Sequence, residues 1–456
     1  MGDLPRALLS DASWYGTLAA LRNLNFHGVP VTLASDSLMA PARWSRHVTH
    51  VHSCPSTKNA DRFLDWLLQF GAKNPGHVLY PTSDETAWLV SANSEALSDY
   101  FQLYAPPVSS LVRLLDKACL AEEARAAGLD VPECRVPRDE AEAAKVANEI
   151  GFPIYVKPRA QVCGTGLGKG ELTRNLNELR LSWCAQRERG SYQATILREV
   201  PDLSLPMLQE ATGNERIYTV DGFADATGEL YISIACVKLL QRPRGSGPGI
   251  IFEHAESNPA VNAGLKRLFQ NTGYFGVFDA EFLECGERLL LVDINPRFYN
   301  HMAFEIDRGL PLPWLAYLAA TRDWEALRQE VTRAQLCQSG CRRYVQRLPT
   351  ALLLATQRLK GAMPIEDQTR WRSFLNDSKA SSTEPARAPN DPGPAIAEIA
   401  MEAFAFLRHP RAYLKGLWRS PNLAGRQPKG ESFIPRDGRM PNCNGSLSPN
   451  LKYSSK

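Results

Sequence analysis

Two neighbouring segments carry oxygen-bearing side chains at spacings that suit a metal site. Asp279 and Glu281 lie two residues apart in one segment, and Asp293 and Asn295 lie two apart in the next. Side chains alternate along a strand, so each pair would share one face. A turn at 285–287 would join the strands. A ligand set of carboxylate and amide oxygens, without thiolate or imidazole, suits Mg²⁺. Because protein-bound Mg²⁺ often binds substrate phosphates, the pattern predicts nucleotide-phosphate chemistry.

The alternative is that these acidic residues form the solvated face of an antiparallel sheet. The segment 289–292 is apolar on both faces, which indicates a buried strand that ends in Asp293 and Asn295. Buried carboxylates need partners or a metal, so this context favours a ligand site.

Two lysines and a glycine-rich loop precede the acidic strands. Lys157 lies in a predicted strand at 154–158, and a lysine on a rigid strand can hold a phosphate as a point charge. Lys117 lies in a helix predicted at 110–127, and an ordinary surface lysine is the alternative to a functional role. In the glycine-rich loop, backbone N–H groups could approach phosphate oxygens closely. The spacing of its glycines fits no standard phosphate-binding motif, and a flexible hairpin is the alternative. The loop residues concerned are Gly164, Thr165, Gly166, Gly168 and Gly170.

Two further groups are candidates for binding. Gln209 and Glu210 follow an apolar strand, where an adenine could hydrogen-bond to side chain and backbone; a strand end meeting solvent is the alternative. Lys238, Arg242 and Arg244 lie in a basic, glycine-containing segment that could hold a substrate carboxylate. A solvated hairpin tip is the alternative for this segment.

Composition sets broad limits. With 456 residues the chain can form two or three domains, and a net charge of +3 with 22% charged residues does not predict a nucleic-acid partner. The ten cysteines include no CxxC pair, which favours reduced thiols over zinc fingers or disulfides. No signal peptide is recognisable and no apolar run is long enough to span a bilayer, so we expect a cytoplasmic protein.

The sequence divides into segments of different character. Residues 1–110 alternate strand and helix signals, which predicts a small parallel α/β domain; only Gly16 follows its first strand, so a tightly bound dinucleotide is not expected. The other expected segments are a second domain at 111–325, a helical extension at 326–376, a linker at 377–395 and a basic, largely disordered tail at 396–456.

One amphipathic helix is expected at 395–406, where that tail begins. The region beyond it mixes aromatic residues with positive charge. Contact with an anionic membrane is therefore an alternative, less favoured than a soluble tail or a packing helix.

The order of these features resembles the ATP-grasp family over about residues 6–325. The chain has, in this order, a lysine on a helix, a lysine on a strand, a glycine-rich loop, a strand that ends in Gln-Glu, and the two carboxylate strands. The most specific match is Leu291-Val-Asp-Ile-Asn-Pro-Arg297, which is similar to the family's Glu-x-Asn-Pro-Arg. The continuation through Phe298, Ala303 and 309–317 is closest to predicted ATP-grasp carboxylate–amine ligases, with D-aspartate ligase-like proteins among them. The resemblance implies an α/β protein: an N-terminal Rossmann-like (pre-ATP-grasp) domain, then a two-lobed ATP-grasp α+β domain with a partly disordered C-terminal tail.

The resemblance also implies roles for the candidate residues. Lys117 and Lys157 would bind the phosphates of ATP, and the loop 164–170 would close over them. Gln209 and Glu210 would read adenine or ribose. The metal ligands, for two Mg²⁺ ions or alternatively Mn²⁺, would be Glu281, Asp293 and Asn295, and Arg297 would stabilise the transferring phosphoryl group. Asp293 replaces the family's glutamate, and Asp279 is a possible substitute ligand.

The implied reaction is ATP-dependent ligation of a carboxylate to an amine through an acyl phosphate, releasing ADP and phosphate. It needs no enzyme nucleophile, and Cys163 is interpreted as a small loop residue. The expected substrates are small molecules, with amino acids the favoured class, and a homodimer is compatible with the sequence. The alternatives are carboxyphosphate or carbamoyl-phosphate-type transfer, and a non-catalytic nucleotide-binding sensor.

Overall fold

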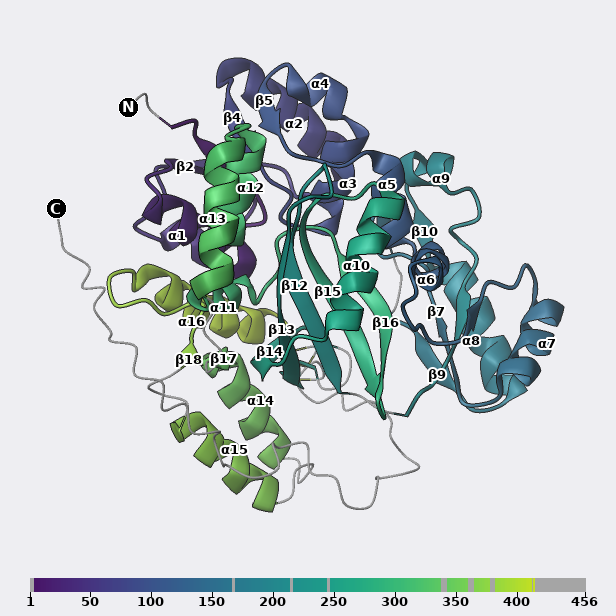
Figure 1. Ribbon diagram of the computed structural model, residues 1–456. Helices are drawn as coiled ribbons and strands as arrows, with labels where there is room; N and C mark the ends of the chain where they lie inside the picture. Colours follow the sequence, from purple (N-terminus) through teal and green to yellow (C-terminus); the bar gives the residue numbers. More distant parts are fainter. Residues whose placement is uncertain are drawn as a thin grey trace.

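The computed structural model describes residues 4–165, 169–213, 216–243, 247–337, 343–359, 365–377, 382–411 and 413–414. A seven-stranded sheet occupies the centre of the molecule (Figure 1). An N-terminal α/β domain lies on one side of this sheet and a smaller lobe on the other. The predicted combination of a parallel domain with a two-lobed α+β domain is confirmed.

The N-terminal domain is built on a five-stranded parallel sheet of order β3-β2-β1-β4-β5. Its strands β1 and β2 are buried along their whole length, as the apolar sequence requires when helices cover both faces. The strands are β1 Ala7–Leu9, β2 Val31–Ser35, β3 His50–Ser53, β4 His77–Leu79 and β5 Phe101–Leu103. The helices are α1 Tyr15–Phe26, η1 Pro41–Trp44, α2 Ala60–Lys73, α3 Asp84–Ala92 and α4 Ser94–Ser98.

The smaller lobe contains a four-stranded antiparallel sheet of order β6-β11-β7-β9. Ile154, Val156 and Leu208 point from this sheet into a core shared with its helices, so the opposite face is left for other contacts. The strands are β6 Cys134–Arg135, β7 Ile154–Lys157, β9 Glu171–Thr173 and β11 Met207–Glu210, with β8 Gly164–Thr165 paired to β10 Ser191–Tyr192. The helices are α7 Glu140–Ile150, α8 Leu176–Arg189 and α9 Ala194–Glu199.

The central sheet has the order β16-β15-β12-β13-β14-β17-β18. The strands are β12 Ile217–Ala224, β13 Tyr231–Gln241, β14 Gly249–Ala255, β15 Gly276–Cys285, β16 Arg288–Asn295, β17 Arg343–Val345 and β18 Ser382–Thr383. The remaining helices are α5 Val108–Leu115, α6 Lys117–Ala126, α10 Pro259–Thr272, α11 Met302–Asp307, α12 Leu312–Ala320, α13 Trp324–Cys337, α14 Arg347–Leu359, α15 Ile365–Asp377 and α16 Gly393–Arg408.

Alternation along β15 separates two cores. Phe278, Ala280 and Phe282 pack against α5, α6 and α10 on one face of the sheet. Val277, on the other face, joins an apolar cluster that continues through α12 into α1 and β1. At this junction a Cβ on Gly16 would lie 2.4 Å from the Tyr299 carbonyl oxygen, so only glycine lets α1 approach the chain after β16.

One predicted helix proved to be two. The helix expected at 110–127 is interrupted at Asp116, which has extended backbone angles and separates α5 from α6. The Asp116 side chain caps the second helix by accepting from the Ala118 amide at 3.0 Å. It also forms a buried ion pair with Arg159, so a tertiary contact overrides the continuous helical pattern.

The segment 377–395 was interpreted as a linker, and its described part is packed instead. Strand β18 extends the central sheet, and the buried Asp391 carboxylate accepts hydrogen bonds from Arg22 Nε at 2.9 Å and Ser45 Oγ at 2.7 Å. The helix expected at 395–406 is confirmed as α16, which lies against η1. Among the described residues, no helix is both long and apolar enough to cross a membrane.

Candidate active site

The acidic strands meet as their spacing predicted. In the antiparallel pair β15–β16, Asp279 lies opposite Asn295 and Glu281 opposite Asp293. The strands are joined by a two-residue turn in which Gly286 has a φ of +61°, a conformation that glycine adopts at little cost. Asn295 Nδ2 donates to Asp279 Oδ2 at 3.0 Å. The four side chains therefore share one face at the end of the two strands.

Lysines from two other elements neutralise this face. Lys238 Nζ on β13 lies 2.7 Å from Glu281 Oε1, and the Lys117 ammonium at the start of α6 pairs with Asp293. Burial by itself would raise the pKa of Asp293, but Lys117 holds it below the usual value. Burial also opposes the charge on Lys238, yet Glu281 raises the pKa of this lysine above its ordinary value.

The break between α5 and α6 places Lys117. Its backbone N–H donates to the Arg159 carbonyl oxygen at 2.9 Å, while the Arg159 guanidinium pairs with Asp116. Because Arg159 follows β7 closely, these contacts tie the helix that carries Lys117 to the strand that carries Lys157.

Arg297 is held by the N-terminal domain. Its Nε donates to Asp84 Oδ1 at 2.8 Å and its Nη2 donates to Asn295 Oδ1 at 2.8 Å. Asp84 is the first residue of α3, in the loop region after β4. Burial would lower the pKa of Arg297, and Asp84 more than offsets this. Asp84 was not predicted as a site residue, and only its place after a strand of a parallel sheet hinted at a role.

The smaller lobe contributes Lys157 from its free face. In the antiparallel pair, Lys157 lies opposite Met207 and Tyr155 opposite Gln209, so Gln209 is on the same face as Lys157. Its side chain is buried there. Burial and then the nearby Lys117 lower the pKa of Lys157 to about 7, although Asp293 acts in the opposite direction. Glu210 lies on the other face of β11, so its side chain does not point with Lys157.

The end of the glycine-rich loop lies over this lysine. Gly170 has a φ of +107°, and a Cβ there would lie 2.7 Å from Lys157 Cβ. Burial lowers the pKa of the neighbouring Lys169, while the Glu281 and Asp293 carboxylates act to raise it. Lys169 was not among the predicted site residues; its place within the loop was the signal that could have found it.

Asp279 supports the fit of a cation. Its side chain is only 3% exposed, and its Oδ1 has no hydrogen-bond partner among the described residues. Burial and then the Asp221 carboxylate raise the pKa of Asp279 well above its usual value. A buried carboxylate oxygen beside Glu281 and Asn295 provides the hard-oxygen donor set that suits Mg²⁺. The alternative of a solvated acidic face does not describe this arrangement.

Other candidates are placed differently. Arg242 Nη1 and Nη2 lie 2.6 and 2.9 Å from the two carboxylate oxygens of Glu402 on α16, so this guanidinium is already paired. Gly164 and Thr165 form β8, with Thr165 Oγ1 2.8 Å from Ser191 Oγ. Of the other predicted binding residues, Gly166, Gly168 and Arg244 lie outside the described residues.

Cys163 is a buried residue rather than an exposed thiol. Its side chain is 4% exposed, and burial raises the pKa of the thiol to about 12. A thiol in this state is a poor nucleophile near neutral pH, in agreement with its interpretation as a structural loop residue.

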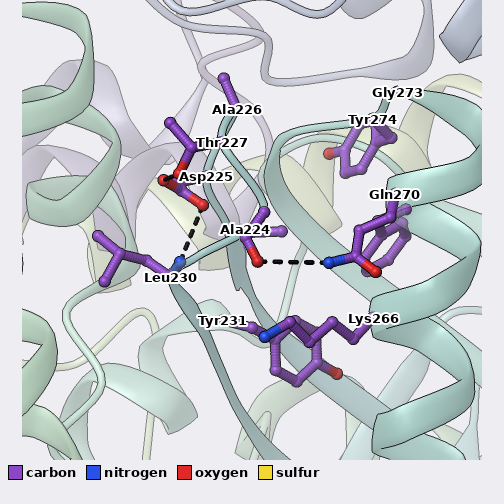
Figure 2. A pocket seen from close by; sticks show the side chains of 12 residues that line it. Ala224, Asp225, Ala226, Thr227, Leu230, Tyr231, Lys266, Gln270, Gly273 and Tyr274 are labelled. Atoms are coloured by element: carbon purple, nitrogen blue, oxygen red, sulfur yellow. Dashed lines mark hydrogen bonds between the residues drawn. The ribbon is translucent and has the colours of Figure 1, made fainter.

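A hollow of about 220 Å³ lies elsewhere, between the β12–β13 hairpin and α10 (Figure 2). Asp225, Tyr231, Lys266 and Gln270 are among the residues that line it, and none of the predicted site residues does. The candidate site is therefore defined by converging charged groups rather than by this hollow.

Similarity to known proteins extends over parts of the chain. No protein-family model matches the sequence. Over 239 residues it is 21% identical to the carbamoyl phosphate synthase large chain of Myxococcus xanthus, which covers 52% of this chain and 20% of the relative. Over 157 residues it is 26% identical to a formate-dependent phosphoribosylglycinamide formyltransferase of Prochlorococcus marinus, covering 33% and 36%. Each alignment thus covers well under half of the relative's own length.

Two solved structures share the fold. A biotin carboxylase–β-γ-ATP complex from Campylobacter jejuni superposes with a TM-score of 0.54 and 16% identity, covering 69% of this chain and 70% of the other. The biotin carboxylase domain dimer of Hydrogenobacter thermophilus 2-oxoglutarate carboxylase, in complex with MgADP, ADP and bicarbonate, gives 0.56 and 16% with 70% coverage of each chain. These similarities support membership of the ATP-grasp superfamily. In the shared fold, the lysines of the smaller lobe and of α6 lie near the acidic strands of the central sheet.

Proposed function

We propose that this chain is an ATP-dependent ligase that joins a small-molecule carboxylate to an amine through an acyl phosphate. One observation carries the proposal. The oxygen ligands of β15 and β16 converge with cationic side chains from three other parts of the chain, Lys117, Lys157 and Lys238. Such a site concentrates positive charge around phosphate while supplying oxygen ligands for its metal.

ATP would lie between the smaller lobe and the acidic strands. Lys117, Lys157 and Lys169 would bind its phosphates, and the buried Gln209 would hydrogen-bond the adenine. Mg²⁺, or Mn²⁺, would be held by Glu281, Asp293 and Asn295, with Asp279 as an additional oxygen donor. The ion supplies charge neutralisation and orientation of phosphate oxygens when bound.

The reaction has two displacements. A carboxylate oxygen of the first substrate attacks the γ-phosphorus of ATP, and ADP leaves. The amine of the second substrate then attacks the acyl carbon, forms the amide or peptide bond and expels phosphate. Arg297, held in place by Asp84 and Asn295, stabilises negative charge on the transferred phosphoryl group. Lys238 would help to hold the carboxylate, and a similar role for Arg242 requires that its pairing with Glu402 open. The chain itself forms no covalent intermediate.

A second candidate is phosphorylation of bicarbonate, as in carboxyphosphate or carbamoyl-phosphate-type chemistry. The relatives that favour it are a carbamoyl phosphate synthase large chain and biotin carboxylases. Bicarbonate is itself a small carboxylate, so the same lysines and metal ligands would serve both reactions.

The test measures ADP release with pooled amino acids, other carboxylates or bicarbonate, with hydroxylamine added to trap an acyl phosphate as a hydroxamate. We expect amino-acid-dependent ADP release and a trapped hydroxamate identified by mass spectrometry. Glu281→Gln or Asn295→Ala should abolish turnover, because each removes a metal ligand. Glu287→Gln, in the exposed turn of the same strand pair, is the matched control and should leave turnover unchanged.

Three other results would contradict the proposal. ADP release that depends on bicarbonate alone supports the second candidate. Nucleotide binding without ADP release under any condition supports the non-catalytic sensor. Full turnover in Glu281→Gln shows that the metal site is misplaced.

A further inference from the structure

A second group of polar side chains is buried beneath the candidate active site. Asp221, Cys236, His301 and Glu305 are all buried, and one ligand atom from each lies within 4.8 Å of the others. None of these residues belongs to the predicted ATP or magnesium site. The proposed ligase reaction does not use them.

Three elements bring the group together. Asp221 lies on β12 and Cys236 on the adjacent β13, where Thr219 pairs directly with Cys236. His301 precedes α11 and Glu305 lies within it, four residues later, so both can face the same side of the helix. Phe252 stacks on the His301 ring with 4.0 Å between centroids, and this encloses the group from β14.

Three of the four carboxylate oxygens of this group lack a hydrogen-bond donor among the described residues. Glu305 is fully buried, its carboxyl group lies against that of Asp221, and neither of its oxygens accepts a hydrogen bond from any other side chain among the described residues. Asp221 Oδ1 also has no hydrogen-bond partner among these residues. Asp221 Oδ2 accepts hydrogen bonds from Thr219 Oγ1 at 3.2 Å and Cys236 Sγ at 3.4 Å, and it lies 3.3 Å from His301 Nε2. Two buried carboxylates side by side need a cation or a shared proton.

The neighbouring Arg308 does not supply that cation through hydrogen bonds. Its Nη2 donates to the Ala235 carbonyl oxygen at 2.9 Å and lies 2.9 Å from His254 Nδ1. Its Nε and Nη1 are buried without a hydrogen-bond partner among the described residues. The guanidinium therefore adds one positive charge nearby but donates no hydrogen bond to Asp221 Oδ1 or to the Glu305 oxygens.

We propose that Asp221, Cys236, His301 and Glu305 bind one zinc ion between the central sheet and α11. Thiolate and imidazole ligands select Zn²⁺ over Mg²⁺ and Ca²⁺, and four protein ligands complete a tetrahedron. Ligand atoms about 2.0–2.3 Å from zinc lie about 3.3–3.8 Å from one another, so small side-chain rotations suffice to close the observed group.

The charges also balance. Two carboxylates and a thiolate carry three negative charges, the ion carries two positive charges, and Arg308 carries one. With all four positions filled by the protein, the ion has a structural role and no open position for a substrate.

The location gives this site a link to the active site. Asp221 on β12 lies directly opposite Asp279 on β15, and Asp279 in turn accepts a hydrogen bond from Asn295. A zinc ion at Asp221 would fix α11 against the strands that position the proposed magnesium ligands. The zinc proposal stands independently of which reaction the chain catalyses.

The experiment uses the full chain without a histidine tag. We expect one zinc per chain by mass spectrometry of the metal after extensive dialysis against Mg²⁺, and a lower Tm after removal by a chelator. Reloading the metal-free protein with Co²⁺ should give a thiolate-to-cobalt charge-transfer band. Cys236→Ser should abolish this band and weaken zinc binding at least about tenfold.

Controls separate this site from other thiols and from the magnesium ligands. Cys134→Ser changes another buried thiol outside the group, and Glu281→Gln removes a proposed magnesium ligand. Both variants should retain stoichiometric zinc and the cobalt–thiolate band. Loss of zinc only in Glu281→Gln would assign the ion to the acidic strands and overturn the proposal.

Two further outcomes would also overturn it. Wild-type protein that takes up neither zinc nor cobalt, with no change in Tm, has no such site, and this result does not depend on whether any variant folds. A Glu305→Gln variant at least as stable as the wild type, with unchanged zinc content, shows that Glu305 is not a zinc ligand and that its carboxyl group instead shares a proton with Asp221.

Discussion

Lys157 should make nucleotide binding depend on pH. Burial and Lys117 lower the pKa of this lysine from 10.5 to about 7, which corresponds to about 5 kcal/mol against the charged ammonium. Below pH 7 the ammonium is present and can bind phosphate. Above pH 7 the free protein loses the proton and must regain it to form the same contact. Affinity for MgADP should therefore fall as the pH rises.

The magnitude follows from linkage with one proton. If the bound phosphate keeps Lys157 charged, the Kd should rise about fivefold between pH 7 and 8 and about tenfold between pH 8 and 9. The phosphates of the nucleotide are themselves ionised over this range. Isothermal titration calorimetry in buffers of different ionisation enthalpy should show proton uptake that approaches one per bound nucleotide.

Variants assign the effect to one residue. Lys157→Arg keeps its charge throughout and should remove the pH dependence. Lys157→Met should bind about 10–100-fold more weakly at pH 7 and approach the wild type at pH 9. Burial also lowers the pKa of Lys169, so Lys169→Arg is the control that should retain the wild-type slope. A flat Kd from pH 7 to 9 without proton uptake would refute the reasoning.

Two further predictions concern groups beside the proposed reaction centre. Asp84→Asn should lower kcat about tenfold with little change in KM for ATP, because it weakens the ion pair that orients Arg297. Steady-state kinetics would measure both constants. A rise in KM of the same size with unchanged kcat would contradict the prediction. Cys163→Ala should retain activity, and wild-type Cys163 should resist iodoacetamide near neutral pH because its thiol is buried and protonated; rapid alkylation with loss of turnover would instead make it a reactive residue.

Much of the fold was readable from local pattern. The helix–strand alternation of residues 1–110 predicted the parallel domain, and the strand pair predicted on either side of the turn at 285–287 is formed by β15 and β16. Errors arose where distant contacts outweigh local preference. Asp116 ends a helix because it pairs with Arg159, 43 residues away, and the predicted linker is packed because Asp391 binds Arg22. The local sequence around Asp116 or Asp391 does not reveal the distant arginine that each of them binds.

The site divides in the same way. The sequence by itself determined that Asp279, Glu281, Asp293 and Asn295 share one face, because strand alternation and a two-residue turn are local properties. Only the tertiary structure decided which cations face them, since Lys117 and Asp293 are 176 residues apart, and Arg297 and Asp84 are 213 apart.

The buried group of Asp221, Cys236, His301 and Glu305 depends on tertiary structure entirely. Only His301 and Glu305 share a short spacing, and all four residues meet only when α11 packs on the sheet. Local backbone geometry fixes which way neighbouring side chains point, whereas burial of apolar surface fixes which distant segments meet. The charges that complete this protein's chemistry are therefore set by the packing of its domains.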